Sequence, residues 1–593
     1  MRRPGDRATS ASCAAILTAA LLAAGCVYSS DTPDLTGKDI RLTILHTSDI
    51  HSRILPYDYV PMYTEEKLGL QADRGKYGGI ARVAYVVKRE RAKAGRSLWL
   101  DSGDLFQGAP IFNYFHGEPE VRAASLAGID AMALGNHEFD VGAANVVEQF
   151  TKWAGFPLLA ANYDFQEGSH DFVNDFEALV DPWTVFNING LKVGVIGVGN
   201  TSSMTSIQEA GNSAGVRPYE QVQIVQDYVN LLRDSVDVVV LLSHLGLGSD
   251  EVVARNVCGL DIVLGGHHHV GLNPPKVIPY DPDPELAAGL LEGGDYEPQD
   301  LDEPGEIAAA LCPAAKRRDV ILAHPNAFAK FVFRYDLIVR DGRIRSHSYE
   351  IFPIDKTVDY DPEVADLLDT YEQELKLAYD LDRVIAVATE DLSRFGTNGG
   401  DSMLGNLVCE AMQRRAGVET DFCVTNSLGI RTDILANADG TPGNVTVETM
   451  FNVLPFENTI TKMVLSGVEV QALLDYSTSR SAGRGCSAQV QVSGVTFDMN
   501  CRTGRAENIM IGGTKVEPHL FYELATNNYM AWGGSGFEML KINTTKEDTG
   551  ISLRDAVTSY MLDHPVLPEC EVPGPGGCES GVAIEDGRIR PTY

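Results

Sequence analysis

Short apolar runs alternate with amphipathic helical segments along the first 350 residues of the chain. Predicted helices occupy residues 78–94, 118–127 and 219–234, where apolar side chains recur at helical spacing. The apolar runs between them are short and are typical of buried strands. This alternation predicts an α/β domain of largely parallel strands with helices on both faces. Two hairpins with Asn-Gly and Asp-Gly turns, at residues 183–198 and 331–351, make the sheet system mixed.

A long helix is predicted between this region and the rest of the chain. Asp361-Pro362 is a favourable helix start, because Asp caps free N–H groups and Pro fits the first turn. Beyond it, short strands and Gly- or Asn-containing turns alternate with predicted helices at residues 402–414 and 467–476. A chain of 593 residues also exceeds what one core usually organises. The expected units are an α/β domain at residues 39–355, a linker helix at residues 356–382 and an α+β domain at residues 383–593.

Polar side chains follow five of the predicted strands at the points where the strands end. Open α/β sheets collect their ligands at the carboxyl ends of their strands. We therefore expect these side chains to lie together. They are Asp49 and His51 after residues 42–46, Asp104 after residues 98–100, Asn136, His137 and Asp140 after residues 129–134, His244 after residues 238–243, and His267 and His269 after residues 261–264.

Carboxylate oxygens and imidazole nitrogens at one edge are suitable ligands for divalent ions such as Zn, Mn or Fe. Asp49 and His51, two apart on one loop, can face a single ion, and Asp104 is placed to bridge two ions. Two ions about 3.5 to 4 Å apart activate water and clamp a phosphoryl group in many phosphoesterases. Asn136, His244 and one or two of His267 and His269 complete the predicted ligand set. His46 and His268 are interpreted as non-ligands, and Asp101 as a supporting residue.

His137 is better placed for catalysis than for metal binding. Asp140 lies three residues on, which brings the two side chains together if a helix starts here. The carboxylate can then orient the imidazole. An imidazole donor of this kind stabilises charge on phosphoryl oxygens or on a leaving group. The sequence therefore predicts His137 and Asp140 as a catalytic pair.

The composition and net charge restrict the kinds of molecule that the protein can bind. Hydrophobic residues make up 44% of the chain and charged residues 22%, as in soluble globular proteins. The net charge of -34, without a basic stripe, argues against nucleic acid as a partner, because a polyanion would be repelled. No stretch after residue 26 is long and apolar enough to be a transmembrane helix.

The first 26 residues have the layout of an export signal. Arginines precede an apolar run at residues 13–24 that is too short to span a bilayer. Ala23-Ala24-Gly25-Cys26 resembles a bacterial lipobox, so Cys26 is a candidate site for a lipid anchor. A plain cleaved signal is the alternative. The expected location is the bacterial cell envelope, either the periplasm or the cell surface.

Export makes disulfide bonds the expected state of the cysteines that follow Cys26. Their even number fits complete pairing. Proximity in the sequence suggests the pairs Cys409 with Cys423, Cys486 with Cys501 and Cys570 with Cys578, which leaves Cys258 with Cys312. Other connectivities stay open, because spacing alone does not fix them.

Together these motifs resemble the five-block signature of the calcineurin-like metallophosphoesterases. The blocks are Asp49-Ile50-His51, Gly103-Asp104, Gly135-Asn136-His137-Glu138, His244 and Gly266-His267-His268-His269. Three later motifs are similar to the C-terminal domain of bacterial periplasmic 5′-nucleotidases and UDP-sugar hydrolases. They are Asn426-Ser427-Leu428-Gly429-Ile430-Arg431, Leu454-Pro455-Phe456-Glu457-Asn458 and Gly533-Gly534-Ser535-Gly536-Phe537. The likeness covers nearly the whole chain after Lys38.

The resemblance implies a four-layer α/β/β/α metal domain and a C-terminal α+β domain that binds the substrate. Carried over by position, one ion would take Asp49, His51, Asp104 and His269, and the other Asp104, Asn136, His244 and His267. His137 and Asp140 match the family's catalytic pair. The implied substrate-binding residues are Arg431 and Arg394 for phosphate or ribose, Phe456 and Tyr529 for the base, and Asn426 in the same motif as Arg431.

Three departures from the family pattern alter the implied nucleoside pocket. Leu428 and Ser535 replace a Gly and an Asp, and residues 396–400 form an insertion after Arg394. The implied activity is release of phosphate from nucleoside 5′-monophosphates, with UDP-sugar hydrolysis as a second activity. One alternative is a 2′,3′-cyclic-nucleotide phosphodiesterase, another phosphomonoesterase or a thiosulfohydrolase on the same scaffold. The other is a surface lipoprotein that binds ligands without turnover.

Overall fold

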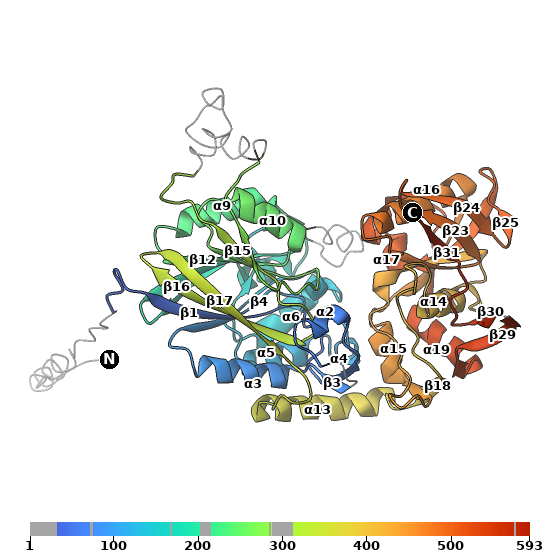
Figure 1. The fold of residues 1–593 in the computed structure, drawn as a ribbon, viewed down its shortest axis with the longest axis horizontal. Helices are drawn as coiled ribbons and strands as arrows, with labels where there is room; N and C mark the ends of the chain where they lie inside the picture. Colours follow the sequence, from blue (N-terminus) through green and yellow to red (C-terminus); the bar gives the residue numbers. More distant parts are fainter. Residues whose placement is uncertain are drawn as a thin grey trace, which may run out of the picture.

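The computed structural model describes residues 33–71, 75–166, 169–201, 215–283, 286, 312–574 and 577–593. The predicted export signal and Cys26 lie outside these residues. Figure 1 shows an N-terminal unit of sheets and helices, followed by helix α13 and a C-terminal unit. Within the described ranges, none of the helices combines the length and the apolar composition that crossing a bilayer requires.

Two β-sheets form the centre of the N-terminal unit. The first has the order β17-β16-β1-β4-β5-β6-β8, and the second has the order β14-β15-β13-β12-β10-β9. The first consists of β17 (Arg343–Pro353), β16 (Phe331–Arg340), β1 (Ile40–Thr47), β4 (Ser97–Asp101), β5 (Ala131–Ala133), β6 (Leu158–Leu159) and β8 (Val180–Asp181). The second consists of β14 (Lys276–Ile278), β15 (Val320–Ala323), β13 (Ile262–Gly265), β12 (Val238–Ser243), β10 (Leu191–Val198) and β9 (Trp183–Ile188). Their central strands pair in parallel, and β16/β17 and β9/β10 are the two predicted hairpins.

The continuous apolar run of β12 shows why the two sheets stack. Val238, Val240 and Leu242 contribute to the core between the sheets, whereas Val239 and Leu241 pack against the helices outside. The outer helices of the second sheet are α9 (Gln221–Leu232) and α10 (Leu247–Asn256). Those of the first sheet are α3 (Ile80–Arg91), α5 (Glu118–Ala127) and α6 (Ala143–Trp153). The expected four-layer α/β/β/α arrangement is therefore confirmed.

The five polar strand ends are divided between the two sheets. Strands β1, β4 and β5 belong to the first sheet, and β12 and β13 to the second. The single edge predicted from the strand pattern is thus made by two stacked sheets, whose parallel strands end on the same side. Residues from both sheets can therefore surround one site.

Helix α13 (Pro362–Tyr379) begins as its start signal predicts. The Asp361 side chain accepts a hydrogen bond from Val364 N at 3.2 Å, with Pro362 in the first turn. The apolar stripe of the helix, which includes Leu368 and Leu375, packs into the same core as α3 and α5. The helix is therefore held along the first unit rather than standing free.

The C-terminal unit is a mixed α/β unit with a five-stranded sheet in the order β22-β19-β26-β21-β27. Its strands are β22 (Val490–Ser493), β19 (Phe422–Asn426), β26 (Phe521–Asn527), β21 (Thr459–Ser466) and β27 (Glu547–Ser552). Helices α14 (Met403–Gln413) and α19 (Leu553–Asp563) contribute to one core, and α16 (Gly467–Ala482) to another. Smaller sheets contain β18 (Val384–Ala388), β20 (Gly443–Thr446) and β28 (Val566–Leu567), and β23 (Val495–Asn500), β24 (Arg505–Ile511), β25 (Thr514–Lys515) and β31 (Ile589–Thr592).

Two of the suggested disulfide pairs are present. Cys258 is bonded to Cys312 and Cys486 to Cys501. Cys570 is also disulfide-bonded, but the Cys578 side chain lies outside the described part of the chain. The suggested Cys409–Cys423 bond is wrong for this structure. Both are buried free thiols whose sulfur atoms lie 2.7 Å apart, in a core where side-chain packing alone brings α14 and β19 together.

Candidate active site

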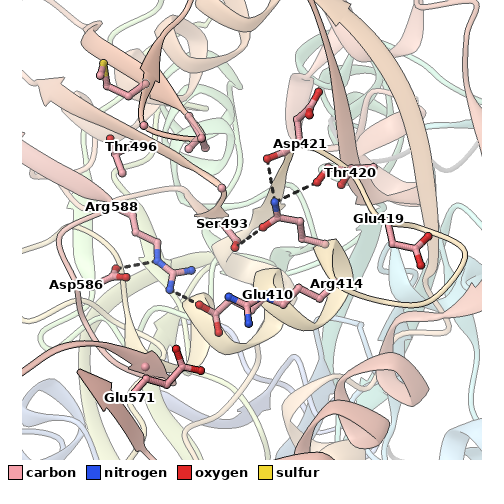
Figure 2. A pocket seen from close by; sticks show the side chains of 17 residues that line it. Glu410, Arg414, Glu419, Thr420, Asp421, Ser493, Thr496, Glu571, Asp586 and Arg588 are labelled. Carbon is pink, nitrogen blue, oxygen red and sulfur yellow. Dashed lines mark hydrogen bonds and ion pairs between the residues drawn. The ribbon is translucent and has the colours of Figure 1, made fainter. Parts of the chain in front are cut away.

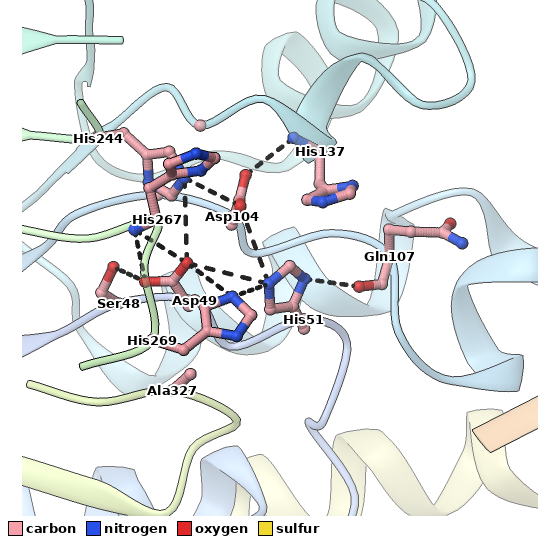
Figure 3. A network of polar contacts seen from close by, with 12 residues as sticks. Ser48, Asp49, His51, Asp104, Gln107, His137, His244, His267, His269 and Ala327 are labelled. Carbon is pink, nitrogen blue, oxygen red and sulfur yellow. Dashed lines mark hydrogen bonds and ion pairs between the residues drawn. The ribbon is translucent and has the colours of Figure 1, made fainter. Parts of the chain in front are cut away.

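The polar strand ends converge on one buried cluster of carboxylates and imidazoles. Figure 3 shows Asp49, His51, Asp104, His244 and His269 pointing toward a common centre. They come from the loops after β1, β4, β12 and β13. Three overlapping groups of possible metal ligands are Asp49, His51 and His269; His51, Asp104 and His137; and Asp104, His244 and His267, and the ligand atoms in each group lie within 4.8 Å of one another.

Asp104 occupies the middle of the cluster. Its Oδ2 lies 2.9 Å from His244 Nε2 on one side and 3.8 Å from His51 Nε2 on the other. Its Oδ1 accepts a hydrogen bond from the His137 backbone N–H at 2.8 Å. One carboxylate therefore faces two sets of imidazole nitrogens, as a ligand shared by two ions would.

Asp49 forms the second anionic centre. Its Oδ1 lies 3.3 Å from His269 Nε2 and 3.9 Å from His51 Nε2. The Ser48 hydroxyl donates to its Oδ2 at 2.5 Å, and the His267 backbone N–H lies 3.1 Å from both carboxylate oxygens. These contacts fix the carboxylate and leave Oδ1 directed at the histidines.

The histidines are oriented as metal ligands usually are. His51 Nδ1 donates to the Gln107 carbonyl at 2.8 Å, and His244 Nδ1 donates to the Ser102 carbonyl at 2.6 Å. A neutral imidazole that donates from Nδ1 presents a lone pair at Nε2. The Nε2 atoms of His51 and His269 are 2.9 Å apart and face the same point. Asn136 Oδ1 is buried, and no hydrogen-bond partner for it occurs among the described residues. Divalent cations fit this donor set, because they would satisfy both the lone pairs and the orphaned amide oxygen.

The protonation preferences agree with this fit. Burial lowers the pKa of His51, His267 and His269, in the case of His267 to about 3, so these rings are neutral ligands at neutral pH. Burial alone would raise the pKa of Asp104, but the neighbouring His244 and His137 hold it well below its usual value. Three of the four proposed histidine ligands and the Asp104 carboxylate are therefore already in the form that binds an ion. His244 differs, because Asp104 and Asp49 outweigh burial and raise its pKa to about 10, so this ring would release a proton on binding an ion.

Two glycines allow the loops to approach this closely. A Cβ atom on Gly135 would lie 2.2 Å from Asp104 Oδ1, and one on Gly266 would lie 2.2 Å from Ser48 Oγ. Neither position can hold a side chain without displacing a carboxylate of the cluster or its partner. Steric crowding therefore explains why glycine precedes Asn136 and His267.

His137 and Asp140 form the contact that their spacing predicts. A short 3₁₀ helix, η1 (His137–Phe139), brings His137 Nδ1 to 2.8 Å from Asp140 Oδ2. Burial opposes a proton on His137, but Asp140 and Asp104 outweigh it and raise the pKa of the imidazole. His137 is thus biased toward the form that donates from both nitrogens.

Residues of the C-terminal unit reach the cluster from the other side. Arg431 Nη2 lies 3.4 Å from His51 Nε2, and the Phe456 ring stacks on His137 with centroids 5.7 Å apart. The Arg394 guanidinium donates to the Arg431 carbonyl, so it supports Arg431 rather than reaching the metal-ligand residues. Two of the five predicted substrate residues therefore contact the cluster directly.

Asn426 and Tyr529 lie further back in the C-terminal unit. Asn426 is buried and accepts a hydrogen bond from Asn527 Nδ2 at 2.8 Å. Tyr529 is 36% exposed, and its hydroxyl accepts from Ser535 N at 3.1 Å. A hydrogen bond of 2.8 Å between Asn458 and Asn528 joins the segments that carry Phe456 and Tyr529. The two aromatic residues thus lie on adjoining segments, Phe456 on a loop and Tyr529 in helix α17 (Asn528–Ala531).

Three residues at the site were not predicted from the sequence. Glu138 is fully buried and accepts hydrogen bonds from the backbone N–H groups of Leu105 and Gly135, each at 2.7 Å, which ties the Asp104 loop to the Asn136 loop. The Phe328 ring packs on His51 and His269, with centroids 5.3 and 4.9 Å away. The Gln107 carbonyl accepts the hydrogen bond from His51 Nδ1. Glu138 stands inside a quoted motif and could have been singled out, whereas nothing near Phe328 or Gln107 in the sequence signals the site.

A separate cavity of about 790 Å³ lies within the C-terminal unit (Figure 2). Its polar side chains are bonded to one another. Arg588 binds both Glu410 and Asp586, and Gln413 accepts a hydrogen bond from Ser493 at 2.6 Å. This cavity includes none of the predicted site residues.

The fold and the cluster define the chain as a metal-dependent hydrolase of phosphoric esters. The calcineurin-like phosphoesterase family matches residues 42–271, and the family described as 5′-nucleotidase, C-terminal domain, matches residues 384–542. The chain therefore belongs to the two-domain 5′-nucleotidase family of metallophosphoesterases.

Relatives match over nearly their whole length. A snake venom 5′-nucleotidase of Gloydius brevicauda is 28% identical, over 89% of this chain and 87% of the relative. Protein UshA of Yersinia enterocolitica is 27% identical, over 93% of this chain and 96% of the relative. The crystal structure of a 5′-nucleotidase precursor from Thermus thermophilus is similar with a TM-score of 0.74 and 26% identity, covering 93% of this chain and 99% of that chain.

Proposed function

We propose that the protein is a 5′-nucleotidase that uses two divalent ions to release phosphate from nucleoside 5′-monophosphates. The observation that carries the proposal is the position of Asp104 between His244 and His51. The proposed ligands are Asp49, His51, Asp104 and His269 for one ion, and Asp104, Asn136, His244 and His267 for the other. Zn or Mn suits these donors. When bound, such ions lower the pKa of water and hold a phosphoryl group in line for attack.

The remaining chemistry falls to side chains around the cluster. His137, oriented by Asp140, donates a proton or a hydrogen bond from Nε2 to the phosphoryl oxygens or the leaving oxygen. Arg431 neutralises charge on the phosphoryl group, with Arg394 holding its backbone. Phe456 and Tyr529 stack on the base, and Asn426 supports the Arg431 loop. Relatives named 5′-nucleotidase support the choice of substrate.

The His137→Ala, Asp140→Asn double variant tests the proposed catalytic pair. Turnover of AMP should fall by at least 100-fold, because one general acid typically contributes 10²- to 10⁴-fold. Metal content should stay near that of the wild type, since neither side chain is a proposed ligand. Both quantities are measured on the same preparation, by phosphate release and by elemental analysis. Retention of most activity would contradict the assignment.

Substrate comparison tests the nucleotide class. AMP, UDP-glucose, a 2′,3′-cyclic nucleotide and p-nitrophenyl phosphate are compared by kcat/KM on the metal-loaded protein. AMP should have the highest kcat/KM, and UDP-glucose should be hydrolysed as a second substrate. A preference for the cyclic nucleotide would assign the altered pocket with Leu428 and Ser535 to a phosphodiesterase. Binding of AMP without phosphate release would assign the chain to the non-catalytic class.

We further propose export to the bacterial cell envelope with a lipid anchor on Cys26. The two disulfide bonds support an oxidising compartment. A Cys26→Ser variant should move from the membrane fraction to the soluble fraction, while retaining its phosphatase activity. Mass spectrometry of the N-terminal peptide checks the anchor directly, and an unmodified peptide beginning before or at residue 26 would contradict it.

A further inference from the structure

The carbonyl of Pro455 joins the two units near the site. Gln107 Nε2 donates to it at 2.9 Å and Asn113 Nδ2 at 3.0 Å. Both donors belong to the N-terminal unit, Gln107 on the loop after Asp104 and Asn113 on α4 (Pro110–Phe115), and both are buried. Arg554 of the C-terminal unit approaches the same oxygen at 3.4 Å. A carbonyl has two lone pairs, so this one is fully used.

The residue after this carbonyl is Phe456, whose ring lies on His137. The ring planes are inclined by 26° and the centroids are 5.7 Å apart. The guanidinium of Arg431 lies 5.5 Å from the Phe456 ring centroid. Proline has a fixed φ, so fixing the Pro455 carbonyl restricts the direction in which the chain enters Phe456. The position of the ring over the site therefore depends on Gln107 and Asn113.

Gln107 also contacts His51, one of the proposed metal ligands. Its backbone carbonyl accepts the Nδ1–H of His51 at 2.8 Å, and its own φ is +63°. The next residue, Gly108, is so close to His51 that an added Cβ would lie 2.5 Å from the His51 carbonyl oxygen. One residue therefore holds a proposed ligand with its backbone and the Phe456 loop with its side chain.

We propose that Gln107, assisted by Asn113, is a positioning residue that sets Phe456 for recognition of the nucleoside. The inference rests on the proposed 5′-nucleotidase function, because it needs Phe456 to contact a base. Affinity for the nucleoside part of the substrate depends on the Gln107 side chain, and affinity for the phosphate part does not, since phosphate is held by the ions and Arg431.

The test uses the full, metal-loaded chain and two inhibitors of AMP hydrolysis. Each inhibitor corresponds to one part of the substrate. Adenosine probes the nucleoside side, and inorganic phosphate probes the metal side. Gln107→Met removes the donor but leaves Pro455 with Asn113 as partner, which limits any effect on folding. The inhibition constant of adenosine should rise about fivefold, and in Gln107→Met, Asn113→Leu it should rise at least tenfold. The inhibition constant of phosphate should change less than twofold.

Two control experiments distinguish a positioning role of Gln107 from general damage to the fold. Gln226→Met makes the same substitution on α9, where it removes a side-chain hydrogen bond of 3.2 Å to the Cys258 backbone carbonyl far from Pro455, and it should change neither constant. In a Phe456→Ala background, Gln107→Met should add nothing to the adenosine constant, because the group that it positions is gone.

The inference is overturned if both constants rise together, if neither changes, or if the effect persists without Phe456. These outcomes are separate from failure of the proposed function. A wild-type protein that does not hydrolyse AMP refutes the nucleotidase proposal. If the wild type hydrolyses AMP but Gln107→Met leaves the inhibition constant of adenosine unchanged, only the positioning role is refuted.

Discussion

Five of the seven residues that are proposed to hold ions adopt backbone conformations that their side chains disfavour. Asp49, His51, Asp104, His267 and His269 all have positive φ, between 52° and 74°. Each such residue costs on the order of 1 kcal/mol or more. Strain of this kind persists only where the surroundings enforce it, and here the enforcing contacts are those within the cluster. Bound cations would add a further reason for the loops to keep this shape, since each of these five residues offers a ligand atom.

Glu120 on α5 is a buried acid whose charge is costly. Burial raises its pKa to about 7 from an ordinary 4.5, and a contact with Ser52 only partly offsets this. The folded protein therefore keeps a proton that the unfolded chain releases between these two pH values. This contribution to stability is complete below pH 4.5 and is lost as pH rises through 7, by up to about 3 kcal/mol.

A Glu120→Gln variant should remove this loss, because the amide stays neutral. The variant should be more stable than the wild type by a larger margin at pH 8 than at pH 5, and the two margins should differ by about 1 to 3 kcal/mol in the free energy of unfolding. Urea unfolding at the two pH values measures the difference. Glu177→Gln, at an exposed position, serves as the control and should show no pH-dependent gain. An equal effect of Glu120→Gln at both pH values would contradict the argument.

Helix α13 is fixed at its first turn by a single carboxylate. Asp361 accepts from Val364 N at 3.2 Å and pairs with Lys88 of α3 at 2.6 Å. Burial alone would raise the pKa of Asp361, but the Lys88 and backbone contacts lower it. The stabilisation is therefore present above the unfolded pKa of 3.8 and is lost as pH falls through the lower folded value.

Asp361→Ala should lower the free energy of unfolding by about 1 to 2 kcal/mol at pH 7, mostly through the lost cap. Lys88 is 42% exposed, so the ion pair adds little. The difference from the wild type should shrink as pH falls below the unfolded pKa of 3.8, and its charge-dependent part should be lost once pH is below the lower folded pKa. Asp366→Ala, on the exposed side of the same helix, is the matched control and should change stability by less than about 0.5 kcal/mol. A loss that is independent of pH would contradict the role of the charge.

Elements with strong local signals could be predicted, and those that depend on distant partners could not. The strands that end at Asp49 and His244 and the start of α13 follow from apolar runs and capping residues. Helix α16 extends to Ala482, beyond the predicted end at 476, and the buried Thr478 and Ser481 in its last turns satisfy their hydroxyls by donating to the carbonyls four residues earlier, each at 2.8 Å. The separation of the strands into two sheets, and the link of Gln107 to Pro455, 348 positions away, join segments whose proximity no local pattern reveals.

The whole molecule places a proposed anion-binding site on an acidic protein. The net charge is -34, yet Arg431 faces the cluster with Arg394 behind it, and neither guanidinium pairs with a carboxylate in the described part of the chain. Burial and the nearby Arg394 lower the pKa of Arg431 to about 10, which leaves it charged at neutral pH. We therefore expect local positive charge, rather than net charge, to determine which ligands the proposed site binds.

Removal of the ions should destabilise one unit and spare the other. The proposed ligands all lie in the N-terminal unit, so ions that bind only its folded form stabilise that unit, by about 2.7 kcal/mol at a free concentration 100 times Kd. The C-terminal unit has its own cores and the Cys486–Cys501 bond. In scanning calorimetry, a chelator should abolish activity and lower the transition of the N-terminal unit by several degrees, with little change in the other transition. Added Zn or Mn should restore both quantities, and chelator that is already saturated with metal is the control. A chelator that left both transitions and the activity unchanged would show that the cluster works without ions and would end the two-metal proposal.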